Sequence, residues 1–408
     1  MTAGALTINA GFIPLIDAAV PLAAAQRGFA ESEGIHLALN RESSWANIRD
    51  KTAVGHFDLA HMLAPMPIAT NLGLDPLPSR LIVPMALGLN GNTIVVSNDL
   101  HRQMAATGSF TPGDPVTFAQ ALGRVVRRQD RRPVFAVVHP VSAHRYELAY
   151  LTAFGGLQLG KDIDMIVLPP QLMTDALESN QISGFCAGEP WGSLAQARGA
   201  GRIATTKAAV WRSSPEKVLG VRAEWADRHP EALLALIRAL YRAALWCDDP
   251  ANRNDLAAML ARAENLDQPA ELILASLTGA TSEPQGVNAF VFAARAATFP
   301  WISHALWFYS QMVRWGQVEF SKQGERLARE TVRPDLYRAA LSPLKATMPG
   351  ASSKVEGALA APTPVGATAG QLLLGPDGFF DGRIFDPDKV ADYLAGFALP
   401  AGVDGNSD

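Results

Sequence analysis

Short apolar runs alternate along the chain with segments in which apolar residues recur every three or four positions. In the first part of the chain the apolar runs lie at residues 5–9, 35–39 and 57–60, and a segment with helical periodicity follows each run. Short, mostly apolar strands that alternate with helices are typical of a parallel sheet covered on both faces. The pattern therefore predicts an α/β fold.

The same alternation starts again after residue 97. Further strands are expected at residues 133–138, 164–168 and 182–186, and long helices at residues 230–247, 254–263 and 304–315. We expect two lobes joined by two crossings: lobe I comprises residues 1–96 and 205–408, with the C-terminal helical part, and lobe II comprises residues 97–204. Such lobes close on a small molecule, and the carboxyl ends of their strands face the cleft.

Composition narrows the class of protein. The chain has 408 residues, 48% of them hydrophobic and 18% charged, and this length suits two lobes better than one small core. The formal net charge of −4 gives no electrostatic footprint for nucleic acid. Cys186 and Cys247 lie in apolar surroundings and are expected to be core thiols. Because no basic, apolar or lipidated leader precedes the first expected strand, we expect a cytoplasmic protein.

One stretch carries candidate binding chemistry. Gly188 ends an expected strand, and Pro190 suits the first turn of the helix that follows. Backbone N–H groups at such a turn bind anions, although the turn needs Gly188 whether or not an anion is present. Lys217 follows a Ser-Pro turn one strand-helix unit later. A glycine turn together with a lysine predicts a site for a small anion, with no nucleophile.

Segments spread along nearly the whole chain resemble, in order, the nitrate-binding and bicarbonate-binding proteins of ABC importers and their cytoplasmic relatives. The segments are residues 11–15, 44–50, 61–67, 90–92, 185–191, 215–220, 307–308, 311–316 and 333–337. The resemblance implies a type II periplasmic-binding-protein fold, with two lobes around a ligand cleft and two crossovers. Importer members carry a lipoprotein signal, so the start of this sequence favours the cytoplasmic branch. That branch is the NasS-type nitrate/nitrite sensor, which holds an RNA-binding antiterminator of the ANTAR class (NasT type) and releases it on anion binding, thereby controlling nitrate assimilation genes.

The resemblance also implies a set of anion ligands, without a metal or a cofactor. The tryptophan of the family falls on Trp45, its histidine on His144, its glycine backbone contact on Gly188 and its lysine on Lys217. A family glutamine falls on Asn92, which is shorter by one methylene. Bicarbonate binders depart from the nitrate pattern at the lysine and the histidine and use calcium. The residues present here imply nitrate or nitrite.

Each candidate also has a structural interpretation. Lys217 beside a turn could be a solvated surface lysine, and at a cleft mouth it would contribute little to folding stability. Trp45 could pack beneath lobe I, Asn92 could serve only its turn, and His144 could cap a helix. Glu189 is expected to orient a donor of the site from behind, because a carboxylate facing the anion would repel it.

Two other functions remain open. The chain could be the solute-binding component of a nitrate ABC importer, which differs from the sensor in compartment. It could also be an enzyme on the same fold, as in the resembling thiamine-pyrimidine synthases, which use a cysteine-rich motif and a histidine. Cys186 and Cys247 form no such motif. We therefore expect a binding protein rather than an enzyme.

Overall fold

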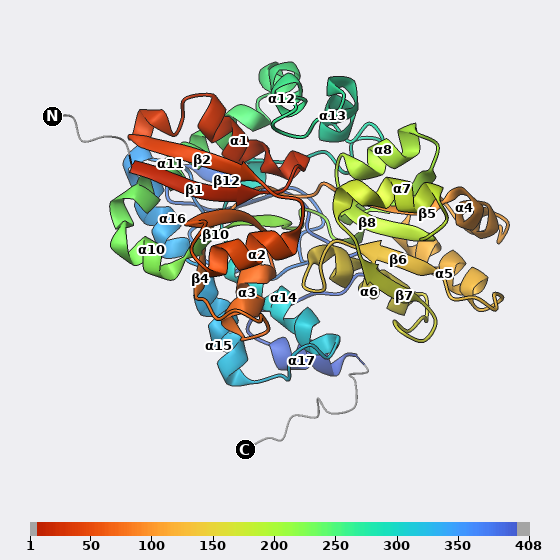
Figure 1. The fold of residues 1–408 in the computed structure, drawn as a ribbon. Coiled ribbons are helices and arrows are strands. Elements are labelled where there is room, and N and C mark those ends of the chain that lie inside the picture. The colour runs from red at the N-terminus through yellow and green to blue at the C-terminus, as the bar shows by residue number, and fades with distance from the viewer. Residues whose placement is uncertain (1–5, 398–408) are drawn as a thin grey trace.

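The computed structural model describes residues 6–397 and contains two five-stranded sheets that lie side by side (Figure 1). The first sheet, which we call lobe I with the helices around it, has the strand order β2-β1-β3-β10-β4. Its strands are β1 (Leu6–Phe12), β2 (Ile35–Arg41), β3 (Leu59–Leu63), β4 (Leu81–Ala86) and β10 (Lys217–Arg222). The expected strand at residues 5–9 begins at Ala5, which lies outside the described residues.

The second sheet, the centre of lobe II, has the strand order β7-β6-β8-β5-β9. Its strands are β5 (Asn92–Ser97), β6 (Val134–Val137), β7 (Asp164–Val167), β8 (Gly184–Gly188) and β9 (Gly201–Thr206). Each sheet is flanked by helices, so the predicted α/β fold is confirmed. A separate hairpin, β11 (Thr363–Gly366) and β12 (Gln371–Leu374), lies in the C-terminal part.

The sheets differ from the expected parallel arrangement at the strands that follow the crossings. Strand β10 runs antiparallel to β3 and β4, and β5 runs antiparallel to β8 and β9. A strand that arrives from the other lobe begins on the side of its sheet that faces that lobe. Its neighbours end on that side, so it runs antiparallel to them. Because β5 and β9 both belong to the second sheet, the chain crosses before Asn92 and after Thr206, outside the boundaries expected at residues 96/97 and 204/205.

Helices cover both sheets and form the C-terminal part. In lobe II and its connections they are α4 (Asn98–Ala105), α5 (Pro115–Val126), α6 (Ala143–Phe154), α7 (Met173–Glu178), α8 (Trp191–Ala197) and α9 (Lys207–Val210). The first three helices of lobe I are α1 (Ala19–Gln26), α2 (Trp45–Ala53) and α3 (Met66–Asn71). Those that follow β10 are α10 (Ala223–Arg228), α11 (Pro230–Asp248), α12 (Arg253–Leu260), α13 (Ala270–Leu277), α14 (Ile302–Arg314), α15 (Lys322–Thr331), α16 (Pro334–Leu341) and α17 (Val390–Ala395). The long helices expected from periodicity are confirmed to within about a turn.

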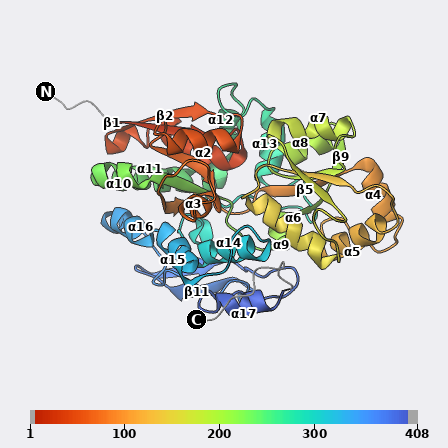
Figure 2. The ribbon, with the colours of Figure 1, turned by 60° about the horizontal axis from the view of Figure 1, so that its bottom comes forward.

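The C-terminal segment ties the lobes together. Figure 2 shows β11 and α17 lying below α14. Phe379 stacks on the rings of Trp211 and Trp307, and the Asp381 carboxylate accepts a hydrogen bond from Tyr150 of α6 at 2.6 Å. Trp307 is buried. Within residues 6–397, no helix has the length and apolar character needed to cross a membrane.

Candidate anion-binding site

The antiparallel crossings bring the candidate residues to the strand ends that face the other lobe. Lys217, the first residue of β10, pairs in register with Leu63, the last residue of β3. In the same way Asn92, the first residue of β5, pairs with Gly188, the last residue of β8. The strand ends of both lobes therefore supply polar groups to one region, which is where open α/β sheets bind ligands.

Two helix starts point into the same region. Trp45 begins α2, and the hydroxyl oxygen of the preceding Ser44 accepts a hydrogen bond from the Asn47 N–H at 3.2 Å. His144 lies in the first turn of α6, and the Ser142 hydroxyl oxygen accepts a hydrogen bond from the Arg145 N–H at 3.1 Å. A serine before an apolar-faced helix is a strong start signal. Helix N-termini also favour a nearby negative charge.

The structure brings these candidates together. The Lys217 ammonium nitrogen lies 5.3 Å from the centre of the Trp45 ring, and the Nδ1 atom of His144 lies 3.4 Å from the Glu216 carboxylate. A methyl group added to Gly188 would lie 3.5 Å from the Oδ1 atom of Asn92. That these five residues contact an anion stays a prediction. Their grouping at the junction of the two lobes is a property of the fold.

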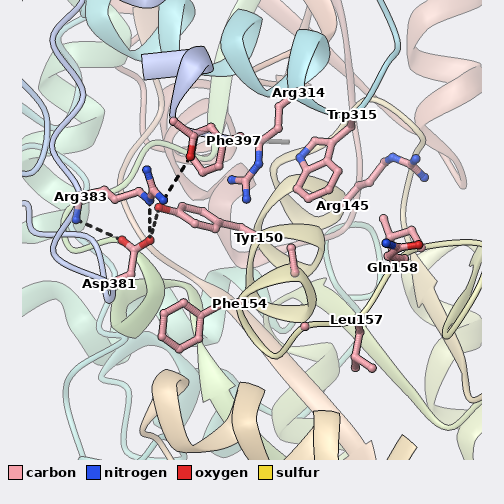
Figure 3. Close-up of a pocket in the computed structure, with 14 residues that line it drawn as sticks. Arg145, Tyr150, Phe154, Leu157, Gln158, Arg314, Trp315, Asp381, Arg383 and Phe397 are labelled. Atoms are coloured by element: carbon pink, nitrogen blue, oxygen red, sulfur yellow. Dashed lines mark hydrogen bonds and ion pairs between the residues drawn. The ribbon is translucent and has the colours of Figure 1, made fainter. Parts of the chain in front are cut away.

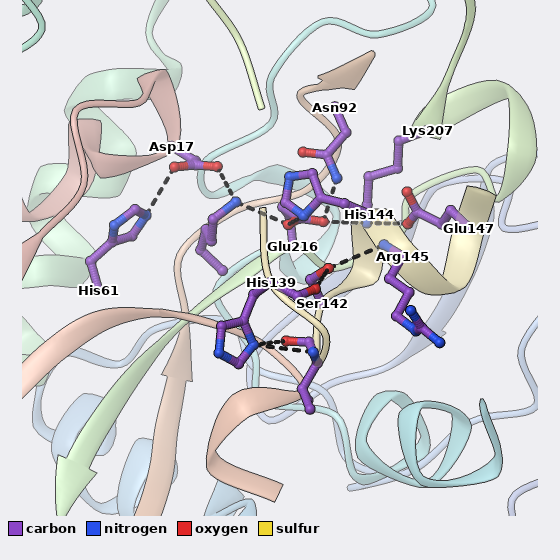
Figure 4. A network of polar contacts seen from close by, with 12 residues as sticks. Asp17, His61, Asn92, His139, Ser142, His144, Arg145, Glu147, Lys207 and Glu216 are labelled. Carbon is purple, nitrogen blue, oxygen red and sulfur yellow. Dashed lines mark hydrogen bonds and ion pairs between the residues drawn. The ribbon is translucent and has the colours of Figure 1, made fainter. Parts of the chain in front are cut away.

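Sequence reasoning missed a network of buried charges around the site (Figure 4). Glu216 is its centre: its Oε1 atom accepts from Lys217 at 2.9 Å, and its Oε2 atom accepts from Lys207 at 2.6 Å. Asn92 also donates to Oε2, at 2.7 Å. Lys207 donates to Glu147 as well. Only Glu216, next to Lys217 in the chain, had a local signal in the sequence.

A second carboxylate holds Lys217 from the lobe I side. Asp17 follows β1, and its Oδ2 atom accepts a hydrogen bond from the Lys217 ammonium at 2.6 Å. The other oxygen of Asp17 lies 2.9 Å from the Nε2 atom of His61 on β3. An ammonium group has three N–H donors, so two are used by carboxylates and one remains. Lys217 therefore keeps one donor for a further acceptor.

Lys217 differs from both descriptions that the sequence suggested for it. It is neither a solvated surface lysine nor a residue at a cleft mouth, because only 1% of its surface is exposed. Burial disfavours its charge, but the Asp17 and Glu216 carboxylates outweigh burial and raise its pKa. Removing one partner of a buried ion pair leaves the other partners uncompensated. We therefore expect Lys217 to contribute to folding stability, in place of the small contribution expected for a lysine at a cleft mouth.

Burial and neighbouring charges set the protonation states of the network. Burial raises the pKa of Glu147 to about 7, although Lys207 opposes the shift. Burial also favours a protonated Glu216, but Lys207 and Lys217 outweigh it and hold the pKa of Glu216 well below its usual range. Burial lowers the pKa of His144 to about 3, so this imidazole is neutral at physiological pH. When Glu147 carries a proton, the two lysines balance Asp17 and Glu216.

Several polar atoms at the site lack a hydrogen-bond partner among residues 6–397. They are the indole nitrogen of Trp45, both ring nitrogens of His144, Oδ1 of Asn92 and Nδ1 of His61. Unpaired buried polar groups are rare in native proteins because each costs about 1–3 kcal/mol. Trp45 and His144 each offer an N–H beside the Lys217 charge. This arrangement suits a small anion that accepts hydrogen bonds from several directions.

Glu189 has a different role from the expected one. Its carboxylate accepts hydrogen bonds from the backbone N–H of Ser193 at 3.0 Å and from the Ser193 hydroxyl at 2.9 Å. It therefore fixes the start of α8 and makes no side-chain hydrogen bond to the candidate ligands within the described part of the chain. Its backbone connects the lobes instead, because its carbonyl accepts from the Ile16 N–H at 2.9 Å.

Known proteins are similar to this chain in both fold and sequence. The crystal structure of the periplasmic nitrate-binding protein NrtA from Synechocystis PCC 6803 matches with a TM-score of 0.84 and 28% identity, over 96% of this chain and 98% of that one. The nitrate/nitrite binding protein NrtA of Synechocystis sp. is 30% identical over 402 residues, which cover 95% of this chain and 84% of that protein. The chain therefore has the two-lobed periplasmic-binding-protein fold of substrate-binding proteins.

The chain belongs to the NMT1-like family, whose model matches residues 3–261. A further relative, the nitrate import ATP-binding protein NrtC of Synechocystis sp., is 32% identical over 344 residues. The match covers 81% of this chain and 49% of NrtC, so the chain spans about half the length of that relative. Two of these relatives are named as nitrate-binding or nitrate/nitrite binding proteins.

Proposed function

We propose that the chain binds nitrate or nitrite at the junction of its two lobes. The observation that carries the proposal is the position of two unpaired donors, the Trp45 indole and the His144 imidazole, beside the buried charge of Lys217. The similarity to NrtA proteins, named for nitrate or nitrite binding, supports the choice of anion. The proposal gives roles to Trp45, Asn92, His144, Gly188 and Lys217.

The chemistry of each group suits a planar monoanion. Lys217 supplies the charge and its third N–H, and Trp45 supplies an indole N–H. A neutral His144 donates one N–H without adding a second positive charge. Gly188 leaves space at the strand end, because no side chain projects from it. Asn92 already donates to Glu216, so its part is to position that carboxylate as well as to contact the anion.

Anion binding is coupled to the relative position of the lobes. Trp45 and Lys217 belong to lobe I, whereas Asn92, His144 and Gly188 belong to lobe II. An anion held by both sets adds contacts that exist only when the lobes are together. Closure around a ligand is a common transition of two-lobed proteins. The bound anion therefore favours the closed arrangement.

We further propose that this closure is read by a partner protein in the cytoplasm. The support is the resemblance of the chain's motifs to the NasS-type sensor, whose partner is an ANTAR-type antiterminator of the NasT type. The net charge of −4 gives this chain no electrostatic attraction to RNA, so the proposal assigns RNA binding to the partner. Nitrate releases the partner only if it binds the partner-free form better, and the partner then weakens nitrate binding by the same factor.

The second candidate is the solute-binding component of a nitrate importer. The similarity to the periplasmic nitrate-binding protein NrtA favours it. Co-purification with an ANTAR-type antiterminator, with and without nitrate, distinguishes the two. The sensor proposal predicts a complex of the chain with the antiterminator that dissociates when nitrate or nitrite is added. An ANTAR protein that never binds, together with a chain that is found outside the cytoplasm, would support the importer component.

Calorimetric titration of anion-free protein tests binding itself. Nitrate or nitrite should bind in a 1:1 ratio, and bicarbonate should bind weakly because Lys217 and His144 keep the nitrate-type chemistry. If neither nitrate nor nitrite gave a binding signal, the proposed function would be overturned. Titrations in the presence of calcium show whether bicarbonate gains affinity from a metal.

A further inference from the structure

A cavity away from the nitrate candidates lies between lobe II and the C-terminal part of lobe I. It is a cavity of about 840 Å³ bordered by α6, the loop at residues 156–159, the end of α14 and the C-terminal segment (Figure 3). We call it the Arg314 cavity. Its size is in the range of natural small-molecule sites. Arg145 and His144 are consecutive residues of α6, yet Arg145 lines this cavity while His144 lies at the lobe junction.

The cavity contains buried donors without acceptors. Arg314 is only 7% exposed, and its Nη1 atom has no hydrogen-bond partner among residues 6–397. The Nε atom of Arg145 and the indole nitrogen of Trp315 are also buried and unpaired. Guanidinium and indole groups donate hydrogen bonds and accept none. Three unpaired donors at one cavity indicate a ligand that brings acceptor atoms, and the two arginines indicate that it is negatively charged.

Asp381, the carboxylate among the described lining residues, accepts no hydrogen bond from these three donors. Asp381 accepts a hydrogen bond from the Tyr150 hydroxyl at 2.6 Å and forms an ion pair with Arg383 at 3.3 Å. Arg383 is therefore compensated. Arg314 and Arg145 form no ion pair within the part of the chain that the structure describes. Burial lowers the pKa of both guanidinium groups, but a guanidinium stays charged in proteins.

Aromatic rings fix the position of Arg314. Its guanidinium carbon lies 3.6 Å from the ring centre of Phe397 and 4.6 Å from those of Tyr150 and Trp315. Rings on its faces leave the edge of the guanidinium, where the N–H groups point, for a ligand. Phe154, which is 41% exposed, and Leu157 add apolar wall. A planar fork held in this way suits a carboxylate or a phosphate group.

We propose that the Arg314 cavity binds a small organic acid, with a carboxylate or phosphate on a flat apolar body. The acid group lies against one of the two arginines, which lie on opposite sides of Trp315 (Figure 3), and the apolar body lies along Phe154, Leu157 and Trp315. The site uses none of the residues proposed to contact nitrate. An inorganic oxyanion lacks the apolar body, so it fills only part of the cavity.

Calorimetry with the full chain tests this site with three matched probes: 2-naphthoate, 2-naphthyl phosphate and the neutral 2-naphthalenemethanol. At least one acid should bind at least tenfold more tightly than the alcohol, and the two acids distinguish a carboxylate source from a phosphate source. At least one of Arg314→Gln and Arg145→Gln should weaken binding of the acid by about tenfold to a hundredfold, the cost of a hydrogen bond to a charged group.

Arg102→Gln is the matched control, because Arg102 is a largely exposed arginine of lobe II paired with Asp99. It removes the same charge and should leave the affinity unchanged. Urea denaturation shows whether Arg314→Gln still folds. If it does not, Arg145→Gln, at a half-buried position, carries the test instead. Equal binding of acids and alcohol would overturn the proposal, and so would affinity for the acids that neither arginine variant changes.

Discussion

The ammonium group of Lys217 lies 2.9 Å from the carboxylate of its own chain neighbour, Glu216. The same carboxylate accepts from Lys207 through its other oxygen, at 2.6 Å. One carboxylate thus holds both buried lysines of the network. An incoming monoanion does not have to bring the lysines together, because Glu216 has already done so. The anion needs only the remaining donors, so the two lysines do not have to change partners on binding.

Replacing Lys217 by methionine should remove binding and also destabilise the fold. The affinity for nitrate should fall by about a hundredfold or more, because a buried anion loses its counter-charge, at a cost of about 2–5 kcal/mol. Asp17 and Glu216 lose their shared partner, and breaking a buried pair costs about 3–5 kcal/mol. Calorimetry and urea denaturation measure the two effects. Lys322→Met, at a largely exposed lysine, should change neither. A Lys217→Met protein of full stability and affinity would contradict this account.

Gly188→Ala should separate binding from folding. The added methyl group meets its nearest atoms, on Asn92, Asp17 and Leu15, at 3.5 Å, which is ordinary van der Waals contact. The fold should therefore tolerate it, whereas the methyl group takes the space proposed for the anion. We expect a nitrate affinity at least tenfold weaker and a nearly unchanged midpoint of urea denaturation. Gly378→Ala, with no atom within 4 Å, is the matched control. Tight nitrate binding by Gly188→Ala would place the anion elsewhere.

Trp45→Phe tests the indole N–H. Phenylalanine keeps most of the packing against His61 and loses the donor. The affinity should fall by about tenfold to a hundredfold, the cost of one hydrogen bond to a charged group. Trp225→Phe removes another buried indole, on α10, and should bind nitrate like the unmodified protein. If Trp45→Phe binds equally well, the indole packs beneath lobe I and does not contact the anion.

Nitrate binding should weaken as the pH rises through about 7. The pKa of Glu147 is raised from 4.5 to about 7, so the carboxyl group is neutral below this value and gains a negative charge above it. That charge lies beside Lys207 and Glu216 and disfavours a second anion. Titrations between pH 6 and 8 should show the loss, and Glu147→Gln should bind equally at both ends of the range.

Glu189→Gln is the control for this pH effect. The pKa of Glu189 is also raised to about 7 by burial, but its carboxylate bonds to Ser193 on α8 rather than to the lysines. This variant should keep the pH dependence. If the pH dependence disappeared in Glu189→Gln and persisted in Glu147→Gln, the titrating group would be Glu189, and the assignment to Glu147 would be wrong.

Local sequence signals identified the parts of the site that depend on local structure. Ser44 and Ser142 each cap a helix, so the starts of α2 and α6 were predictable, whereas Trp45 and His144 were chosen as ligands from the family resemblance. The direction of β5 and β10 was not predictable, because periodicity identifies a strand without saying which edge of the sheet it enters. The lobe boundaries were misplaced for the same reason.

The charged network shows where sequence reasoning ends. Asp17 and Lys217 are 200 positions apart, and Glu147 and Lys207 are 60 apart. An isolated acidic residue in a sequence is usually solvated, and nothing near Asp17 or Glu147 marks it as buried. Only the pairing of distant strands and helices brings these carboxylates to the lysines. The resemblance that placed Lys217 therefore gave no account of what holds it.

A crystal structure of the protein grown with nitrate tests the central claim most directly. We predict a planar anion at the junction of the lobes, with oxygen atoms about 2.7–3.2 Å from the Lys217 ammonium, the Trp45 indole nitrogen and a ring nitrogen of His144. Glu216 should still join Lys207 and Lys217 in that structure. Nitrate bound at another place, or an empty junction in crystals of protein that calorimetry shows to be saturated, would contradict the account.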